Sequence, residues 1–443
     1  MNRLTLTRRR GLMLGASALA AACSPKAEAP APEATAPIGD PFAEDALRAD
    51  LEFLDQGEFL QTGGLGDIAT AQRTEARLVQ AGFEISRQNF QAPGFDVQRA
   101  ELEVNGEAIP VAPQAIVVPT GPDGIEAPMR IWRSDADTPA MKDAIAMVML
   151  PSARHSRLLS PQIKPALDAA LSAGPRAVVL ITNGPSGETI YLNAPYAKSY
   201  ADIPIATLGP KPGAAALAAA EQGATGKLVV DGKNQTRNSW NLIGRITGRG
   251  PAVVVSTPRT GWVRCVAERG PGFAAFMAMA AWAPKALPGN DLVFVSNCAH
   301  EYDNAGSRAF IEHAAPAPEH THLWVHLGAG LASRALLDNG EVDAGDTPTA
   351  DPLRYVVGTD DTLDVLREAF AGQPGLENPT SASQGAAGEL GEIIEHGFPR
   401  TFGAFSGNPF HHTIADRIDK TDAGLTRQMA IAFRDATLKL ANG

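Results

Sequence analysis

Apolar residues recur along the chain in short runs whose spacing alternates between that of helices and that of strands. Two helices are expected first, one with Leu47, Leu51 and Leu54 on a single face and one over residues 68–81. From residue 144 onward, unbroken apolar runs of strand length alternate with segments of helical spacing. This alternation is typical of an α/β fold whose sheet is covered on both faces.

The remaining expected elements share these two signatures. Strands are predicted over 83–90, 144–150, 177–182, 203–208, 227–232, 241–246, 252–257, 292–297 and 322–329. Helices are predicted over 163–174, 213–223, 274–283, 363–370 and 425–441, with Pro284 ending the third of them. The stretch 97–135 is expected to be β-rich, with a hairpin around Asn105-Gly106.

Composition and charge narrow the class of partner. Hydrophobic residues make up 44% of the chain and charged residues 20%, which is typical of a globular protein and excludes a disordered chain or a coiled coil. The 38 basic and 49 acidic residues give a net charge of −11, which argues against binding to nucleic acid or to an anionic membrane face. No transmembrane run follows the N-terminal segment.

The first 22 residues are expected to be an export signal. A basic segment ending in TRRRG precedes a short apolar run, which is too short to span a bilayer that needs about 20 residues. Thr7-Arg8-Arg9 resembles a twin-arginine signal, and the AAAC sequence that ends at Cys23 resembles a bacterial lipobox. We expect a protein of the bacterial cell envelope or periplasm, held to the membrane only by a lipid on Cys23. Residues 23–41 are then a Pro/Ala-rich tether; the alternative is an ordinary signal cleaved near Ala22.

Polar residues that can carry chemistry follow several of the predicted strands. They lie in STPRTGW, in CAHEYDNAGSRAF, in LGAG and in NPFHHTIADRID. Active sites of α/β sheets lie at the carboxyl ends of the strands, so these segments are expected to meet at one edge. The chain after the signal has no G-x-S-x-G, no P-loop and no C-x-x-C. No motif therefore indicates a serine hydrolase, a nucleotide-binding protein or a dithiol oxidoreductase.

Three stretches of the sequence resemble the di-zinc aminopeptidase family, which includes leucyl aminopeptidases, glutamate carboxypeptidase and the non-catalytic transferrin receptor. They are NLIGRITGRGPAVVVS, FVSNCAHEYDNAGSRAFIEH and FHHTIADRID. The resemblance covers 42–99 and 238–443 and implies an aminopeptidase-like three-layer αβα sandwich with a mixed central sheet. Residues 100–237 resemble the protease-associated domain that such enzymes often carry, a β-rich α/β insert.

The resemblance also implies two zinc ions, five ligands and a catalytic carboxylate. Glu301 and His412 match two of the ligands, and Glu268 is the nearest match to the aspartate that bridges the metals. His300 stands where the family has its catalytic general base. The resemblance therefore implies the whole fold of the family but only part of its metal site.

Two ligand positions of the family are lost. Pro258 and Gly328 stand in their place, and neither has a side chain that can bind a metal. Two divalent ions repel each other unless carboxylates neutralise them, and here Arg259, Arg264 and Arg269 lie nearby in the sequence. Two metals are therefore not expected.

At most one zinc ion is expected instead. Three protein ligands and a water suffice for a catalytic zinc, and Glu301, His412 and either Glu268 or His326 would supply them. His326 shares a strand face with the lost fourth position, although a hydrogen-bonded core histidine is the alternative. His300 would then act as the base, because imidazole titrates near neutral pH.

Several further residues carry a weaker expectation. Arg269 and the helix start beside it would bind a substrate carboxylate, or would form only a helix entry. Glu389 is expected near the substrate or exposed on the surface, and His411 at the surface or behind the ligands. Cys265 and Cys298 each precede a site glutamate by three residues, and they would form either a disulfide or two separate buried thiols.

These observations lead to two hypotheses for the function. The first is an exported hydrolase with a remodelled metal site that cleaves an amide in a peptide or a small amino-acid conjugate. The second is a non-catalytic binding protein on the same scaffold. The retained His300, Glu301 and His412 favour the first, whereas the lost ligands favour the second. Both stay open here, as does the oligomeric state.

Overall fold

A long mixed β-sheet runs through the part of the chain that the structure describes. The computed structural model describes residues 39–133, 141–196, 198–338 and 340–443. The expected signal peptide, the lipidation site at Cys23 and nearly all of the tether lie outside these residues. Within them, no helix is long and apolar enough to cross a membrane.

Most of the predicted elements are present, but the predicted strands 227–232 and 241–246 form one continuous strand and the strand predicted from residue 83 extends to Val104. The helices over 305–313 and 389–395 and the strands after residue 353 were not predicted. The helices are α1 (Glu44–Gln56), α2 (Leu65–Gln80), α3 (Lys164–Ser172), α4 (Ala214–Glu221), α5 (Val266–Ala286), α6 (Ala305–His313), α7 (Leu363–Ala369), α8 (Glu389–Glu395) and α9 (Ala423–Asn442). The strands of the first half are β1 (Glu84–Val104), β2 (Glu107–Pro110), β3 (Ala112–Pro113), β4 (Ile125–Trp132), β5 (Ile145–Met149), β6 (Ala177–Ile181) and β7 (Ile205–Leu208). Those of the second half are β8 (Thr225–Ile246), β9 (Gly250–Pro258), β10 (Asn290–Asn297), β11 (Thr321–Leu327), β12 (Arg354–Gly358), β13 (Thr380–Ser381) and β14 (Thr401–Ser406).

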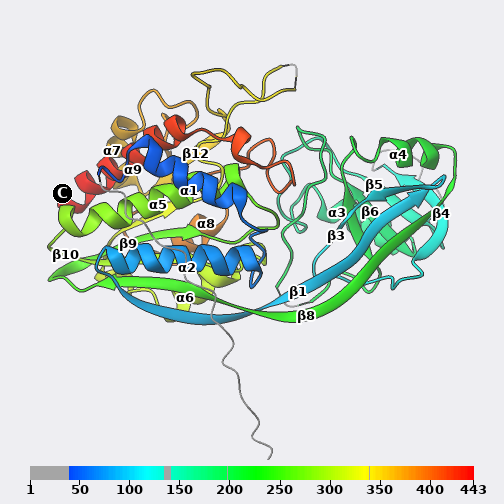
Figure 1. Cartoon of the computed structure of the whole chain (residues 1–443), viewed down its shortest axis with the longest axis horizontal. Helices are drawn as coiled ribbons and strands as arrows, with labels where there is room; N and C mark the ends of the chain where they lie inside the picture. The colour runs from blue at the N-terminus through cyan, green and yellow to red at the C-terminus, as the bar shows by residue number, and fades with distance from the viewer. Residues whose placement is uncertain (1–38, 134–140, 197, 339) are drawn as a thin grey trace, which may run out of the picture. The chain divides into compact units, whose positions relative to one another are not determined.

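The larger part of the fold is a three-layer sandwich (Figure 1). Its strands follow the order β13-β12-β14-β11-β9-β10-β8, and β10, β9, β11 and β14 are parallel neighbours. In β9, Val253 and Val255 join an apolar cluster with α1, α5 and α9, whereas Val254 joins a second cluster with α6 and α8. Because successive side chains of a strand point to opposite faces, an unbroken apolar run is buried on both. The expected α/β sandwich with a mixed sheet is confirmed.

The smaller part of the fold is a second group of strands in the order β4-β5-β6-β7-β3. One of its faces is covered by α4, through Ala216 and Ala219, and the other by α3, through Leu167 and Ala170. The hairpin expected at Asn105-Gly106 is confirmed, because Val104 pairs with Glu107 across that turn.

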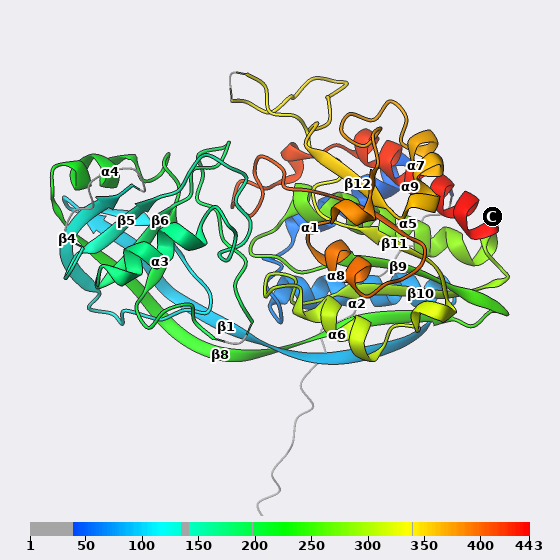
Figure 2. The same cartoon turned by 180° about the vertical axis from the view of Figure 1, so that it is seen from behind.

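Two long strands, β1 and β8, are common to both parts (Figure 2). They pair antiparallel from Glu84↔Arg245 to Glu103↔Lys227. The C-terminal end of β8 also pairs antiparallel with β10, and its N-terminal end pairs antiparallel with β4. The expected domain boundaries, 99/100 and 237/238, fall inside these strands, and all described residues belong to one compact unit. The division into a peptidase-like part and an insert stays a prediction, and "the insert" below means residues 100–237.

The prediction that a helix ends before Pro284 is wrong. Helix α5 continues to Ala286, because a proline so close to the end removes only one hydrogen bond of the last turns. A second proline, Pro271, leaves the carbonyl of Ala267 without its helical partner. The hydroxyl of Ser333 donates to that carbonyl at 3.4 Å, so a loop after β11 supports the first turn of α5.

Helix α2 and three strands meet at a fully buried ion pair. The guanidinium of Arg259, directly after β9, donates from Nε to Asp67 Oδ1 on α2 at 2.6 Å. It also donates to the carbonyls of Ser296 on β10 and Trp240 on β8, at 2.7 and 2.6 Å. The second oxygen of Asp67 accepts from the hydroxyl of Ser239 at 2.6 Å. This network fixes the ends of the strands that lead into the site.

Removing one partner of this ion pair is expected to destabilise the fold strongly. Arg259→Met should lower the free energy of unfolding by about 3–5 kcal/mol, because it leaves the Asp67 carboxylate buried without a counter-charge. Urea denaturation followed by circular dichroism measures this loss. The matched variant Arg99→Met, at a largely exposed position, should leave the midpoint unchanged. Equal midpoints for the two variants would show that the buried pair is not essential.

Candidate functional site

Four segments that were expected to meet do so at one edge of the sheet. Strands β9, β10, β11 and β14 are parallel, so their carboxyl ends lie at the same edge. Thr260 follows β9, His300 and Glu301 follow β10, and Gly328 follows β11 directly. The loop 408–416, which carries two histidines, follows β14.

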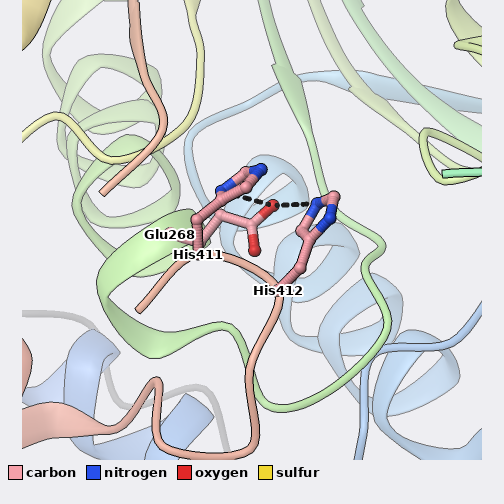
Figure 3. Close-up of side chains that lie close together, drawn as sticks. All are labelled: Glu268, His411 and His412. Carbon is pink, nitrogen blue, oxygen red and sulfur yellow. Dashed lines mark ion pairs between the residues drawn. The ribbon is translucent and has the colours of Figure 1, made fainter. Parts of the chain in front are cut away.

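Three potential metal ligands converge at this edge (Figure 3). In the described part of the chain, Glu268, His411 and His412 form a buried group whose ligand atoms lie within 4.8 Å of one another. Glu268 Oε1 is 3.2 Å from His412 Nε2 and 3.7 Å from His411 Nδ1. The carboxylate thus lies between the two rings, as Figure 3 shows. We call these three residues the Glu-His-His group.

Local backbone geometry brings the two adjacent histidines to the same carboxylate. His412 has a φ of 58°, a left-handed conformation that is uncommon for a residue with a side chain. Neighbouring side chains of an extended chain would point apart, but here the rings of His411 and His412 are stacked with centroids 3.8 Å apart. His411 is 7% exposed, so the alternative of a surface position for it is wrong.

A buried carboxyl ties the histidine loop to helix α5. Asp416 accepts hydrogen bonds from the backbone N–H groups of Ala267 and Glu268, at 2.5 and 3.1 Å. These N–H groups lie in the first turn of α5 and have no partner within the helix. Burial raises the pKa of Asp416 to about 8, with a further contribution from the charge of Glu268. This cap sets the distance between Glu268 and the two histidines.

The geometry of the Glu-His-His group fits a single divalent ion. Ligands about 2.0–2.1 Å from a tetrahedral zinc are roughly 3.3 Å apart, close to the 3.2 and 3.7 Å found here. Glu268 Oε2, His411 Nδ1 and His412 Nε2 are buried and have no hydrogen-bond partner, whereas Glu268 Oε1 is 2.9 Å from a guanidinium nitrogen of Arg269. Buried polar atoms seldom lack a partner, so this arrangement suits a bound cation.

A guanidinium already lies against the same carboxylate. Arg269 is 2% exposed, and its Nη2 is 2.9 Å from Glu268 Oε1, while its Nε donates to the carbonyl of Thr260 at 2.8 Å. Burial raises the pKa of Glu268, but the charges of Arg269 and the two histidines outweigh burial and hold it well below its ordinary value. One positive charge thus balances the carboxylate of the group without any metal.

Glu301 lies outside the Glu-His-His group. Its two oxygens accept hydrogen bonds from the hydroxyls of Thr62 and Thr260, each at 2.6 Å. The same hydroxyls accept from the backbone N–H groups of Ala299 and His300. Burial raises the pKa of Glu301, and this effect is larger than the opposing effect of the hydrogen bonds, which lower the pKa. In this arrangement Glu301 holds the loop that carries His300, and its oxygens are not directed at Glu268.

His300 is paired with a buried carboxyl. Its Nδ1 is 3.1 Å from Glu389 Oε1, and Asn297 donates to the other oxygen of Glu389 at 2.8 Å. Burial, together with the charge of Arg269, holds the pKa of His300 well below its ordinary value. Burial raises the pKa of Glu389, which is 1% exposed, so the alternative of a surface position for it is wrong.

His326 also faces the site but lies outside the Glu-His-His group. Its Nδ1 is 2.9 Å from the hydroxyl of Ser256, as expected for a hydrogen-bonded core histidine. Its neighbour position, Gly328, is constrained by the sheet, because an added Cβ would lie 2.4 Å from the carbonyl oxygen of Ala404. A carboxylate at Gly328 would therefore require the backbone to move.

A cavity of about 440 Å³ lies beside these groups. Its polar lining residues are Arg154, Ser156, His300, His326, Tyr355, Glu389, Ser406 and His411. Arg154 and Ser156 come from the insert and the others from the larger part of the fold. Ligand sites of small-molecule enzymes commonly enclose about 300–1,000 Å³. The cavity thus has room for a small ligand next to both His300 and the Glu-His-His group.

The two cysteines of the site are separate thiols in the structure. Cys265 and Cys298 are both buried and free, so the alternative of a disulfide is not realised. Cys298 lies near Ser239 and Asp67, whereas the sulfur of Cys265 packs against the backbone at Gly261. Burial raises the pKa of Cys298 to about 12, which keeps it a thiol near neutral pH.

No protein-family model and no curated protein matches the sequence. The structure, however, is similar to several solved peptidases. The zinc aminopeptidase BSAP from Bacillus subtilis is 16% identical, with 90% of this chain and 95% of that one covered at a TM-score of 0.66. A peptidase M28 precursor from Shewanella amazonensis is 14% identical, with 91% and 98% covered at a TM-score of 0.68.

A third similar structure is the aminopeptidase from an Aneurinibacillus strain. It is 16% identical, and the match covers 89% of this chain and 93% of that one at a TM-score of 0.61. In all three, the similarity extends over both parts of the fold described above. The chain therefore has the fold of zinc aminopeptidases.

Stability is expected to fall in mild acid because of His326. Burial lowers its pKa from 6.5 to about 4, so between these values the unfolded chain binds a proton that the folded chain does not. The folded state should lose up to about 3 kcal/mol as the pH falls through this window. His326→Gln, which cannot titrate, should reduce the slope of that part of the curve, measured by urea denaturation at a series of pH values, while His300 and His411 keep the remainder. The exposed variant His313→Gln should keep the wild-type slope, and an unchanged slope in His326→Gln would contradict the assignment.

Proposed function

We propose that this chain is a hydrolase that cleaves an amide in peptides or small amino-acid conjugates and holds at most one metal ion. The observation that carries the proposal is the Glu-His-His group beside a 440 Å³ cavity, on the fold of zinc aminopeptidases. The similar structure of BSAP, a zinc aminopeptidase, supports the reaction class. The cavity size supports a small substrate.

Glu268, His411 and His412 would hold the metal, which we propose to be zinc. A zinc ion supplies Lewis-acid polarisation of a carbonyl in hydrolases of this kind. The number of ions is limited by charge, since Glu268 is the only carboxylate of the group and Arg269 already lies 2.9 Å from it. A second divalent ion would add two positive charges with no further carboxylate to offset them.

His300 is proposed as the general base. Glu389 accepts from its Nδ1–H, so the lone pair on Nε2 is left to take a proton from water or from a substrate. Burial and the charge of Arg269 keep the imidazole neutral near pH 7, the form that can accept a proton. Asn297 donates a hydrogen bond of 2.8 Å to the Glu389 carboxyl, which fixes the orientation of that carboxyl toward His300.

The alternative function is a metal-free binding protein on the same fold. The contact of 2.9 Å between Arg269 and Glu268 favours it, because the guanidinium balances the carboxylate without a metal. In either case we propose that the protein is exported and that Cys23 carries a lipid. The order of basic, apolar and small residues in 1–23 supports this location.

The metal content distinguishes these functions. Purified protein that is loaded with zinc and desalted should retain one equivalent or none, as measured by elemental analysis. If it retains one, Glu268→Ala and His412→Ala should each abolish binding, because a three-ligand site cannot lose a member. Glu301→Gln, which alters a carboxylate outside the group, should retain the zinc. Two tightly held ions would contradict the proposed stoichiometry, and none would favour the binding protein.

Hydrolysis is tested with aminoacyl p-nitroanilides and short peptides. His300→Gln should lower kcat by about 10²–10⁴-fold through loss of the base, with little change in KM. His313→Gln replaces an exposed histidine in the same way and should keep wild-type rates. A kcat unaffected by His300→Gln would remove His300 from the reaction. Absence of hydrolysis in the wild type over a broad panel would support the binding protein.

A further inference from the structure

The rings of both histidines in the Glu-His-His group are held by the insert. His412 Nδ1 lies 2.8 Å from the carbonyl oxygen of Tyr191. His411 Nε2 lies 3.2 Å from the hydroxyl of Ser156. In each ring, therefore, one nitrogen contacts the insert and the other faces Glu268.

These contacts determine which nitrogen of His412 is available to a ligand. A carbonyl oxygen can only accept, so Nδ1 of His412 must carry the proton that it donates to Tyr191. In a neutral ring with this proton, the lone pair lies on Nε2, and that atom is the one 3.2 Å from Glu268 Oε1. Partners of this kind commonly fix the tautomer and the orientation of a metal-binding imidazole.

The two insert segments that make these contacts also bind each other. The N–H of Asn193 donates to the carbonyl of Ser156 at 2.8 Å, and the N–H of Leu158 donates to the carbonyl of Asn193 at 3.0 Å. Tyr191 returns a hydrogen bond from its N–H to the carbonyl of His412 at 3.0 Å. We call the segments 154–158 and 191–194 the insert clamp.

The clamp is anchored at three further points of the larger part of the fold. The indole N–H of Trp262 donates to Asn193 Oδ1 at 2.9 Å, and the N–H of Ala194 donates to the carbonyl of Glu301 at 2.9 Å. Arg154 forms a two-pronged ion pair with the buried carboxylate of Asp351 and donates to the carbonyl of Gly407 at 2.8 Å. This last anchor lies next to the histidine loop.

We propose that the insert clamp is a positioning element of the site, and that Ser156 and the Tyr191 carbonyl set the ring orientations of His411 and His412. This inference rests on the proposed metal-binding role of the Glu-His-His group. It gives the insert a part in the site itself, because the affinity of the group for a cation depends on contacts that residues 42–99 and 238–443 do not supply.

The test uses Co²⁺ as a spectroscopic probe of the full mature chain. Ser156→Ala should weaken Co²⁺ binding by roughly 10–100-fold and change the visible absorption bands, because His411 loses its orienting partner. Ser156→Thr, which keeps the hydroxyl, should restore most of the affinity. Ser172→Ala removes a hydroxyl from α3 of the same insert without any contact to the site and should bind like the wild type. A dissociation constant for Ser156→Ala within twofold of the wild type would overturn the proposal.

A second measurement separates this proposal from the proposed function. In metal-free protein labelled with ¹⁵N-histidine, the wild type should show His412 with its proton on Nδ1, and Ser156→Ala should shift the ring signals of His411. If the wild type binds no Co²⁺, the metal role fails, but these ring signals still decide whether the clamp holds the histidines. Unmoved signals in Ser156→Ala, or a His412 ring protonated on Nε2 in place of Nδ1, would overturn the positioning role.

Discussion

The architecture of the site depends on one fully buried ion pair, Arg259 with Asp67. An isolated charge inside a protein is very costly, so each of these groups requires the other and the carbonyls around them. Their hydrogen bonds reach β8, β10 and α2 from the residue directly after β9. The loops that carry Thr260 and His300 leave the sheet within a few residues of this network. Their positions therefore follow from a constraint beneath the cavity rather than from contacts within it.

Charge balance also organises the site above this pair. The Glu-His-His group is buried together with Arg269 and with the pair His300 and Glu389. These six residues include one guanidinium and two carboxylates. Burial favours neutral imidazoles, and the charge of Arg269 adds to that effect at His300 and at His411. His300 and His411 are therefore held in the neutral form near pH 7. Neutral imidazoles suit both a single metal ion and proton transfer, so the same electrostatic setting serves either step of the proposed hydrolysis.

Much of the fold could be predicted from the sequence, because apolar periodicity directly reports which faces are buried. The strands β5, β6, β7, β9, β10 and β11, most helices and the hairpin at Asn105-Gly106 follow from it. The strands β12, β13 and β14 do not, and neither does the continuity of β8, whose exposed residues 233–236 form no apolar run. The continuation of α5 past Pro284 was also missed, since a single proline near a helix end costs little. Glu268 and His412 could be found by resemblance to a family. His411 and Glu389 could not, because their positions depend on a left-handed backbone at His412 and on burial, neither of which local spacing encodes. Thr62, which holds Glu301, lies 239 residues away from it in the sequence.

The shared strands β1 and β8 have a consequence for how such an insert is acquired or lost. A domain attached by flexible linkers can be removed at the linkers, but here the pairs from Glu84↔Arg245 to Glu103↔Lys227 form one ladder, with a single bulge at Gln98 on β1. A shorter chain could close the ladder with a tight turn at almost any rung and keep the rungs below it intact. Lengthening or shortening the ladder would carry the insert toward or away from the histidines in steps of one strand residue, about 3.3 Å. Insertions and deletions in the two strands would then have to occur in pairs, one in each strand, or be absorbed by a bulge such as that at Gln98, to preserve the match between the clamp and the site.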